Sequence, residues 1–253
     1  MRAGGLKKCQ IAAGVLAGGR AERFGGRPKG LLEAAPGICI IEKQVAELAS
    51  SGLEQVVILA NDPLPYRGFG PSIVPDLRAG MGPLGGIETA VSFYANRFHA
   101  TLFLPCDLPA ITERQIRILK ESFVKARAGV AVAVAKGTRR QPLCAVVDND
   151  LLPAISQAID EGKRKVGEVW RDLGALFVHF PEAEPFFNVN APGDWACWLT
   201  AKGWGNRDRY AAGIHREARW PCEQGPPQMN KGGPLAQNQG SQQVSGRRRD
   251  VRR

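Results

Sequence analysis

The sequence predicts an α/β fold with three layers, in which helices cover both faces of a mostly parallel sheet. Short apolar runs alternate along the chain with segments of helical periodicity. The runs are continuous rather than alternating, as is typical of strands buried on both faces. The chain has 253 residues, of which 44% are hydrophobic, and this is enough for one large domain with a substantial core.

The alternating pattern ends near residue 200, so we expect one domain at 1–200 and a tail at 201–253. The tail contains eleven Lys or Arg and four Asp or Glu residues, and so carries +7 of the net charge of +10. From Gln224 onward it is rich in Gly, Gln, Pro and Asn, and it buries too little apolar surface to offset its ordering entropy. We interpret it as a disordered, solubilising extension. Binding of nucleic acid or an acidic partner through Arg247–Arg253 is the alternative.

Several absences in the sequence predict a cytoplasmic protein. There is no uncharged apolar run of about 18 residues, so no membrane span is expected. The basic N-terminus is followed by an apolar stretch that ends in glycines and lacks a cleavage site typical of signal peptides. The six cysteines are scattered without a Cys-x-x-Cys pair, which favours reduced thiols.

The secondary structure follows from apolar periodicity and from breaking residues. Thr112 and Gln115 have the spacing of a helical capping box. Asn188 and Asn190 alternate, which predicts a short strand with both amides on one face. Strands are expected at 11–17, 56–59, 73–74 and 101–104, and helices at 40–48, 83–94 and 112–125. Residues 130–147 are expected to form a β-hairpin or an excursion with a basic tip, and 162–166 a basic turn before an amphipathic helix.

The loop after the first strand has the composition of a phosphate-binding site. Its glycines allow backbone N–H groups to approach phosphate oxygens, and Arg20, Arg23 and Lys29 can add charge-assisted hydrogen bonds. A solvated basic surface loop is the alternative, and the spacing matches neither a Walker loop nor Gly-x-Gly-x-x-Gly. Arg27 lies beside Lys29 but is separated from it by Pro28, and we expect it to be solvated.

Polar residues also follow three further strands, at Asn61, Asp76 and Asp107. Ligands of parallel sheets bind beyond the carboxyl ends of the strands, so these side chains are expected to share one edge with the glycine loop. Each alone could be a helix cap or turn residue, but four strand ends together favour a binding site. Asp107 is flanked by Pro105 and Pro109, which restrict its backbone, and Mg²⁺ bound to a nucleotide needs only one or two protein carboxylates.

A second glycine-rich segment, residues 76–87, leads into a predicted helix. Gly82, Gly85 and Gly86 permit close approach of a planar base or a sugar, and the helix N-terminus adds positive potential. Further along, Asn188 and Asn190 can bind phosphate or metal-bound water, although turn-forming asparagines would have the same pattern.

Taken together, these motifs resemble the molybdenum cofactor guanylyltransferase family over roughly residues 10–200. The matching segments are LAGG at 16–19, KGLL at 29–32, Asn61, Asp76 with GPLGG at 82–86, PCDLP at 105–109, QP at 141–142, GKRKV at 162–166 and NVNAP at 188–192. The resemblance implies a Rossmann-like fold of the nucleotide-diphospho-sugar transferase type. It also implies transfer of GMP from GTP to molybdopterin, with Mg²⁺ as cofactor and release of pyrophosphate.

The same resemblance implies roles for individual residues. Asp107 would hold Mg²⁺, and Lys29, Asp107 and Arg23 would act in catalysis. The nucleotide contacts would be Leu16, Ala17, Gly18, Gly19, Lys29, Asn61, Asp76, Gly82 and Asp107, and the acceptor contacts Lys163, Arg164, Lys165, Asn188 and Asn190. The implied partners are GTP, molybdopterin or Mo-molybdopterin, and molybdopterin-loading proteins or molybdoenzyme chaperones. Neither a membrane nor nucleic acid is expected.

Two residues differ from the family pattern. Pro28 precedes Lys29 where the guanylyltransferases usually have Asp, and Gly-x-Pro-Lys is common in relatives that use CTP or other nucleotides. Ala191 replaces Thr in Asn-x-Asn-Thr-Pro. The alternatives are therefore a related transferase that uses CTP or a sugar-phosphate acceptor, and a non-catalytic protein that binds nucleotides or nucleic acid. For a transferase, the acceptor phosphate is already a nucleophile, so catalysis is expected to consist of positioning and charge neutralisation.

Overall fold

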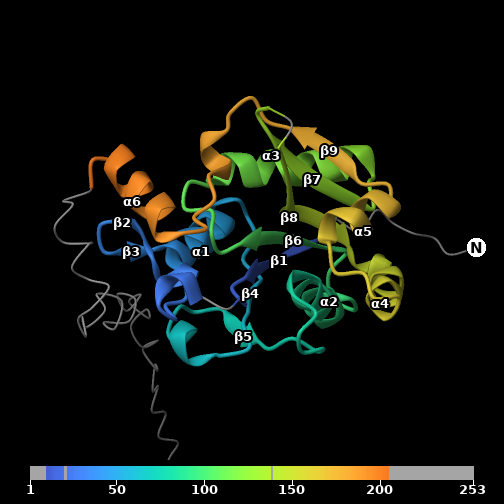
Figure 1. The fold of residues 1–253 in the computed structure, drawn as a ribbon. Helices are drawn as coiled ribbons and strands as arrows, with labels where there is room; N and C mark the ends of the chain where they lie inside the picture. Colours follow the sequence, from blue (N-terminus) through green and yellow to red (C-terminus); the bar gives the residue numbers. More distant parts are fainter. Residues whose placement is uncertain (1–9, 20–21, 138, 205–253) are drawn as a thin grey trace, which may run out of the picture.

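A computed structural model describes residues 10–19, 22–137 and 139–204, which are built around one seven-stranded sheet (Figure 1). Four neighbouring strands run parallel, and β8 is antiparallel to both of its neighbours, whereas β9 runs parallel to β7. The order across the sheet is β5 (Ser72–Val74), β4 (Val56–Leu59), β1 (Ile11–Leu16), β6 (Ala100–Pro105), β8 (Arg139–Asp148), β7 (Val130–Ala135) and β9 (Leu176–His179). This confirms the predicted, mostly parallel sheet and the hairpin over 130–147.

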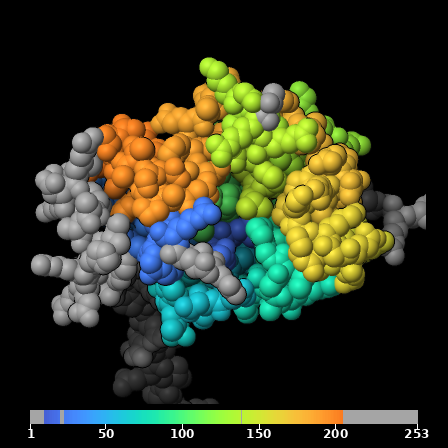
Figure 2. Space-filling model, in the orientation of Figure 1, coloured from blue at the N-terminus to red at the C-terminus, as the bar shows by residue number. Residues whose placement is uncertain are grey.

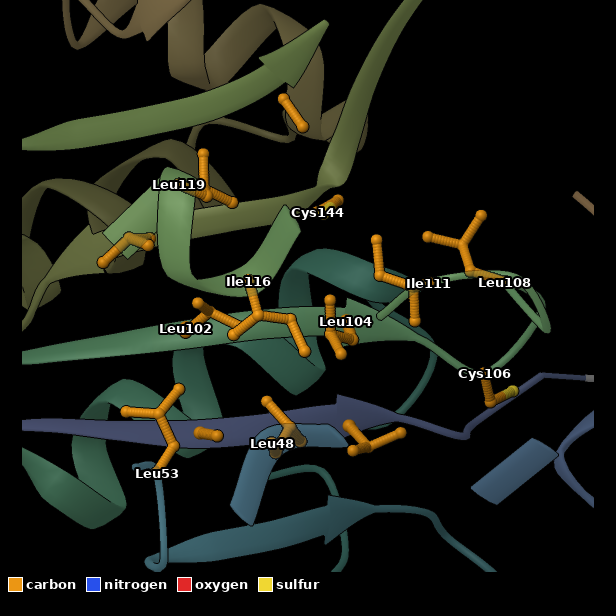
Figure 3. Packing of buried hydrophobic residues seen from close by; sticks show 14 of the residues in the cluster. Leu48, Leu53, Leu102, Leu104, Cys106, Leu108, Ile111, Ile116, Leu119 and Cys144 are labelled. Atoms are coloured by element: carbon orange, nitrogen blue, oxygen red, sulfur yellow. The ribbon is translucent and has the colours of Figure 1, made fainter. Parts of the chain in front are cut away.

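Helices cover both faces of the sheet, because successive strand residues point to opposite sides. Ala13 and Val15 of β1 lie in one core together with residues of α1 (Ile40–Ser50) and α3 (Glu113–Ala126). Figure 3 shows part of this core, in which Leu48 and Leu119 flank Leu102 and Leu104. The other core packs the opposite side of the sheet against α2 (Pro83–Tyr94), α4 (Leu152–Asp160) and α5 (Val166–Asp172). The predicted three layers are therefore present.

A small third cluster joins the last described helix to the start of the domain. Helix α6 (Pro192–Ala201) packs beside a two-stranded hairpin of β2 (Glu33–Ala35) and β3 (Ile38–Cys39). The indole N–H groups of Trp195 and Trp198 donate to the backbone oxygens of Glu33 and Ala34, at 3.1 and 3.3 Å. Strand β2 and helix α6 are thereby brought together, although the bonded residues lie about 160 positions apart.

Two local predictions are wrong. No capping box forms at the start of α3: the Thr112 hydroxyl bonds the side chain of Gln115 at 2.6 Å, and the Glu113 N–H donates to Glu47 instead. Residues 188–190 form no strand, because the Val189 N–H donates to the backbone oxygen of Asp107 rather than to a neighbouring strand.

Two further points concern regions predicted from composition. Among the described residues, no helix has the length and apolar character needed to cross a membrane. The predicted tail, apart from residues 201–204, lies outside the part of the chain that the structure describes.

Candidate active site at the carboxyl edge of the sheet

The four parallel strands end side by side and bring the predicted polar residues to one edge. In the order β5, β4, β1 and β6, these strands lead into Asp76, Asn61, the glycine loop and Asp107. Figure 2 shows a hollow here, bordered by the blue segment that follows β1, the teal segment around α2, the yellow segment of α4 and α5, and the yellow-green hairpin of β7 and β8. The sequence-based expectation that these strand ends share an edge is confirmed.

Three predicted site residues converge on one point of this edge. The Lys29 ammonium lies 3.5 Å from Oδ2 of Asp107 and 3.3 Å from Oδ1 of Asn190. Lys29 belongs to the 3₁₀ helix Lys29–Leu31, Asp107 follows β6, and Asn190 precedes α6. The Lys29 and Asp107 side chains are 26% and 21% exposed, so the pair is reachable from solvent yet partly desolvated.

Backbone contacts fix Asp107 in place. Gln44 is buried on α1, and its side-chain amide donates to the backbone oxygens of Pro105 at 2.8 Å and Leu108 at 3.3 Å. The backbone oxygen of Asp107 itself accepts the N–H of Val189. Sequence reasoning missed Gln44, because its position on the buried face of α1 suits an ordinary core residue.

The electrostatics of this turn suit a cation-binding carboxylate and not a thiol nucleophile. Burial raises the pKa of Asp107 above its ordinary value, and the charge of Lys29 opposes this shift. Burial also raises the pKa of the neighbouring Cys106 thiol to about 12, so Cys106 stays protonated at neutral pH. Cys106 is therefore not a candidate nucleophile, and Asp107 is the candidate cation ligand of this turn.

Asp107 also has an unsatisfied oxygen that a metal ion could engage. Its Oδ1 is buried and has no hydrogen-bond partner within the described residues, so its desolvation is not compensated. The same part of the chain contains no group of three or more His, Cys, Asp or Glu side chains that could hold a metal. A single carboxylate with one unpartnered oxygen fits Mg²⁺, which usually takes one or two carboxylates and completes its shell with water and phosphate oxygens.

The glycine loop leaves β1 through a buried turn and then becomes exposed. Leu16 and Ala17 are buried, the Ala17 N–H donates to Leu59 at 3.0 Å, and Gly18 and Gly19 are exposed. Arg23 is exposed in the 3₁₀ helix Glu22–Phe24, and Arg20 lies outside the described residues. The backbone of residues 18–19 is thus available to a ligand.

Tyr66, which sequence reasoning missed, contacts the glycine loop at both of its ends, Ala17 and Gly30. Its hydroxyl donates to the backbone oxygen of Ala17 at 3.2 Å, while its ring lies against Gly30, where a Cβ atom would stand 3.1 Å from it. Burial raises the pKa of the phenol, so it remains a hydrogen-bond donor. The close approach explains why glycine occupies position 30.

The expectation that Arg27 is solvated is wrong. Its guanidinium donates to the backbone oxygen of Leu31 at 2.8 Å and lies 5.5 Å from the ring centre of Trp195. Arg27 therefore joins the glycine loop to α6, through a hydrogen bond and a cation–π contact.

The predicted nucleotide residues Asn61 and Asp76 bind each other. The Asn61 amide donates to the Asp76 carboxylate, and the Asp76 N–H donates to Oδ1 of Asn61, both at 2.9 Å. Further along the chain, Gly82 precedes α2 with φ 62° and ψ −153°, a backbone conformation that residues other than glycine rarely adopt. Gly86 lets α2 approach β1, since a Cβ atom there would lie 3.0 Å from Leu16.

The remaining predicted acceptor residues have partners outside the Lys29 group. Asn188 donates to Gln141 at 3.4 Å. Lys163 pairs with Asp172 at 2.9 Å, which raises the pKa of the lysine and lowers that of the aspartate, and Lys165 pairs with Glu168 at 3.0 Å. Arg164 donates to two backbone oxygens of the same segment, those of Ile159 and Lys163. The hydrogen bonds and ion pairs of residues 163–165 thus lie within residues 158–172.

Comparison with known proteins identifies the family. The sequence model of the MobA-like NTP transferase domain matches residues 13–175. The chain belongs to this family of nucleotidyltransferases. Curated relatives named molybdenum cofactor guanylyltransferase include that of Shewanella sediminis, 31% identical over 188 residues, covering 72% of this chain and 92% of the relative. That of Pseudomonas fluorescens is 31% identical over 192 residues and covers 74% and 92%. The family resemblance is thereby confirmed.

Solved structures agree on the fold. The molybdopterin-guanine dinucleotide biosynthesis protein A of Archaeoglobus fulgidus has a TM-score of 0.62 and 22% identity, covering 76% of this chain and 98% of that one. A protein of Aquifex aeolicus has a TM-score of 0.60 and 26% identity, covering 74% and 96%. The fold of these structures thus covers 74–76% of this chain, and the family model covers residues 13–175.

Proposed function

We propose that this MobA-like transferase moves GMP from GTP to molybdopterin or Mo-molybdopterin, forms the guanine dinucleotide cofactor and releases pyrophosphate, with Mg²⁺ as cofactor. The observation that supports this most is the convergence of the Lys29 ammonium, the Asp107 carboxylate and the Asn190 amide beside the exposed glycines of the loop. Such a site offers a cation, a metal ligand and backbone N–H groups to one polyphosphate. The names of the curated relatives supply the guanine nucleotide and the acceptor.

Some residues at the carboxyl edge of the sheet would neutralise phosphate charge, and others would hold the nucleotide in position. Lys29 would neutralise charge on the phosphates, and the N–H groups of Gly18 and Gly19 would bind their oxygens. Asp107 and its free Oδ1 would hold Mg²⁺, which supplies further charge neutralisation at the reacting phosphate. The paired Asn61 and Asp76, with Gly82, would bind the nucleoside.

The reaction needs no general base. An oxygen of the acceptor phosphate, which is ionised at neutral pH, forms the new bond to the α-phosphorus of GTP. The bond from that phosphorus to the bridging β-oxygen breaks, and its electron pair leaves with pyrophosphate. Lys29 and Arg23 would compensate the charge of the leaving group. Catalysis then consists of positioning and preorganised charge.

A nucleotide panel tests the proposal. Purified protein with molybdopterin and Mg²⁺ is given GTP, CTP, ATP or UTP, and pyrophosphate release is measured. Release with GTP alone, dependent on molybdopterin, is the expected result. Preference for CTP, or release that requires a sugar phosphate, would instead assign the chain to a related transferase. The Asp107→Ala protein serves as the control, in which release should stop while the protein remains folded.

A further inference from the structure

A network of ion pairs is centred on Arg78, a residue that has no role in the reaction proposed above. Arg78 lies in the segment between β5 and α2, and its Nη2 is 3.0 Å from Oε1 of Glu88 on α2. Its Nη1 also pairs with the carboxylate of Asp160, the last residue of α4. The Ser156 hydroxyl of α4 donates to the same Glu88 oxygen at 2.6 Å. One guanidinium thus ties together a loop and two helices, which lie next to one another in Figure 1.

The loop end of this network carries the predicted nucleotide residues. Arg78 stands between Asp76 and Gly82, two positions after the first and four before the second. The loop backbone is fixed as well, since the Leu77 N–H donates to the Thr89 hydroxyl of α2 at 2.8 Å. A nucleotide that shifts residues 76–82 must therefore also shift the Arg78 guanidinium.

The other end of the network adjoins the basic turn. After Asp160 the chain reverses at Gly162, which has φ 82°. The Lys163 N–H then donates to the backbone oxygen of Ala158 at 2.9 Å, and Arg164 donates to that of Ile159 at 3.2 Å. These contacts tie residues 163–164 to the last turn of α4, so a movement of Asp160 carries the turn with it.

The burial of Glu88 makes a purely stabilising role for the network a poor explanation. The Glu88 side chain is only 4% exposed, and its Oε2 is buried without a partner among the described residues. An apolar contact of similar size between α2 and α4 would give comparable stability without the desolvation cost of a charge. A directional link between specific positions is something that an apolar contact would not provide.

We propose that Arg78 is a positioning residue that couples the nucleotide loop, residues 76–82, to the basic turn, residues 162–165. The inference rests on the proposed function, in which the loop binds GTP, and on the sequence-based expectation that Lys163, Arg164 and Lys165 of the turn contact the acceptor. GTP then orders the turn through Asp160, and by linkage the acceptor strengthens the binding of GTP by the same factor. The coupling fixes both substrates relative to Lys29 and Asp107 at the time of reaction.

The test uses Asp160→Asn, because Asp160 is 64% exposed and its substitution leaves the core intact. Amide hydrogen exchange of the full chain is measured with and without GTP and Mg²⁺, and without any acceptor. In the wild type, GTP should slow exchange both in residues 76–82 and in residues 161–168. In Asp160→Asn, the response of 76–82 should remain and that of 161–168 should disappear. Asp150→Asn, in the 3₁₀ helix Asn149–Leu151 that directly precedes α4, is the matched control and should behave as the wild type.

Steady-state kinetics provide the second measurement. At saturating GTP, Asp160→Asn should raise KM for molybdopterin about two- to fivefold, the range typical of a partly exposed ion pair, with kcat within about twofold of the wild type. Arg78→Lys should raise KM for molybdopterin in the same way, because a lysine ammonium lacks the planar fork of N–H donors with which the guanidinium pairs with both Glu88 and Asp160.

The inference is overturned if GTP leaves residues 161–168 unchanged in the wild type, or if Asp160→Asn keeps the full response. It is also overturned if GTP protects neither segment. A different result would contradict the proposed function itself: wild-type protein given GTP and molybdopterin would release no pyrophosphate, whatever the exchange data show.

Discussion

Replacing Lys29 by alanine should lower kcat/KM for GTP by about thirty- to a thousandfold. The Lys29 ammonium is 26% exposed and lies 3.5 Å from the Asp107 carboxylate, so it acts in a partly desolvated site. Two unit charges about 4 Å apart interact by roughly 4 kcal/mol at the effective dielectric constant of such sites. Allowing for residual solvation, the lost transition-state stabilisation is roughly 2 to 4 kcal/mol, which corresponds to the stated range of rates.

The same substitution should hardly affect folding. The Lys29–Asp107 pair is long and remains open to solvent, so its net contribution to the free energy of unfolding is at most about 1 kcal/mol. For a domain of this size, that corresponds to a decrease in Tm of about 2 to 4 °C. Activity and stability should therefore separate clearly in one variant.

Pyrophosphate release at several GTP concentrations, together with thermal unfolding, checks both statements. Lys125→Ala is the matched control, because Lys125 is an exposed lysine in the last turn of α3, far along the chain from the site. Arg27 cannot serve as the control, since it contacts both Leu31 and Trp195. Equal, small effects of Lys29→Ala and Lys125→Ala that fade at high salt would refute a phosphate-binding role for Lys29.

Three further predictions concern the turn around Asp107 and the basic segment. Asp107→Asn should reduce activity more than about a hundredfold, yet without Mg²⁺ it should raise Tm at pH 7. Because the pKa of Asp107 is raised in the folded state, protonation of this carboxyl stabilises the fold at low pH, and this stabilisation is lost as pH rises through the folded-state pKa. The gain in Tm of Asp107→Asn should therefore shrink towards pH 4. A gain in Tm that stays constant with pH would contradict this reasoning. Gln44→Leu should cost about 1 to 3 kcal/mol in chemical denaturation, because two buried backbone oxygens lose their donor, and an unchanged midpoint would exclude that role. Lys163→Ala should return the lowered pKa of Asp172 towards its ordinary value in an NMR titration, whereas an unmoved pKa would show that the pair does not form in solution.

The elements with the strongest local patterns were predictable from the sequence. Helix α2 spans Pro83–Tyr94 as expected, since a proline opens it directly after the glycine-containing segment 80–82. The buried runs gave β1, β4 and β6 almost to the residue. Asp107 stands out in the sequence as a candidate metal ligand because prolines flank it at the end of a strand, and this pattern lies within a few residues.

The contacts that were missed depend on tertiary structure. Gln44 and Tyr66 act on backbone oxygens far away in the sequence, so no local spacing marks them. The strand expected at Asn188 and Asn190 is absent because the backbone between them bonds Asp107. Alternation alone does not reveal whether a partner strand exists. Likewise, Arg27 looked solvated only because Trp195, its aromatic neighbour, lies far along the chain.

The fate of labelled phosphate tests the central claim most directly. The protein is incubated with Mg²⁺, molybdopterin and GTP labelled either at the α- or at the γ-phosphate, and the products are separated. Nucleotidyl transfer at the Lys29–Asp107 site predicts that the α-label appears in the acceptor and the γ-label in pyrophosphate, with neither result in Asp107→Ala. Transfer of the γ-label to the acceptor, or release of both labels in free nucleotide products, would contradict the account.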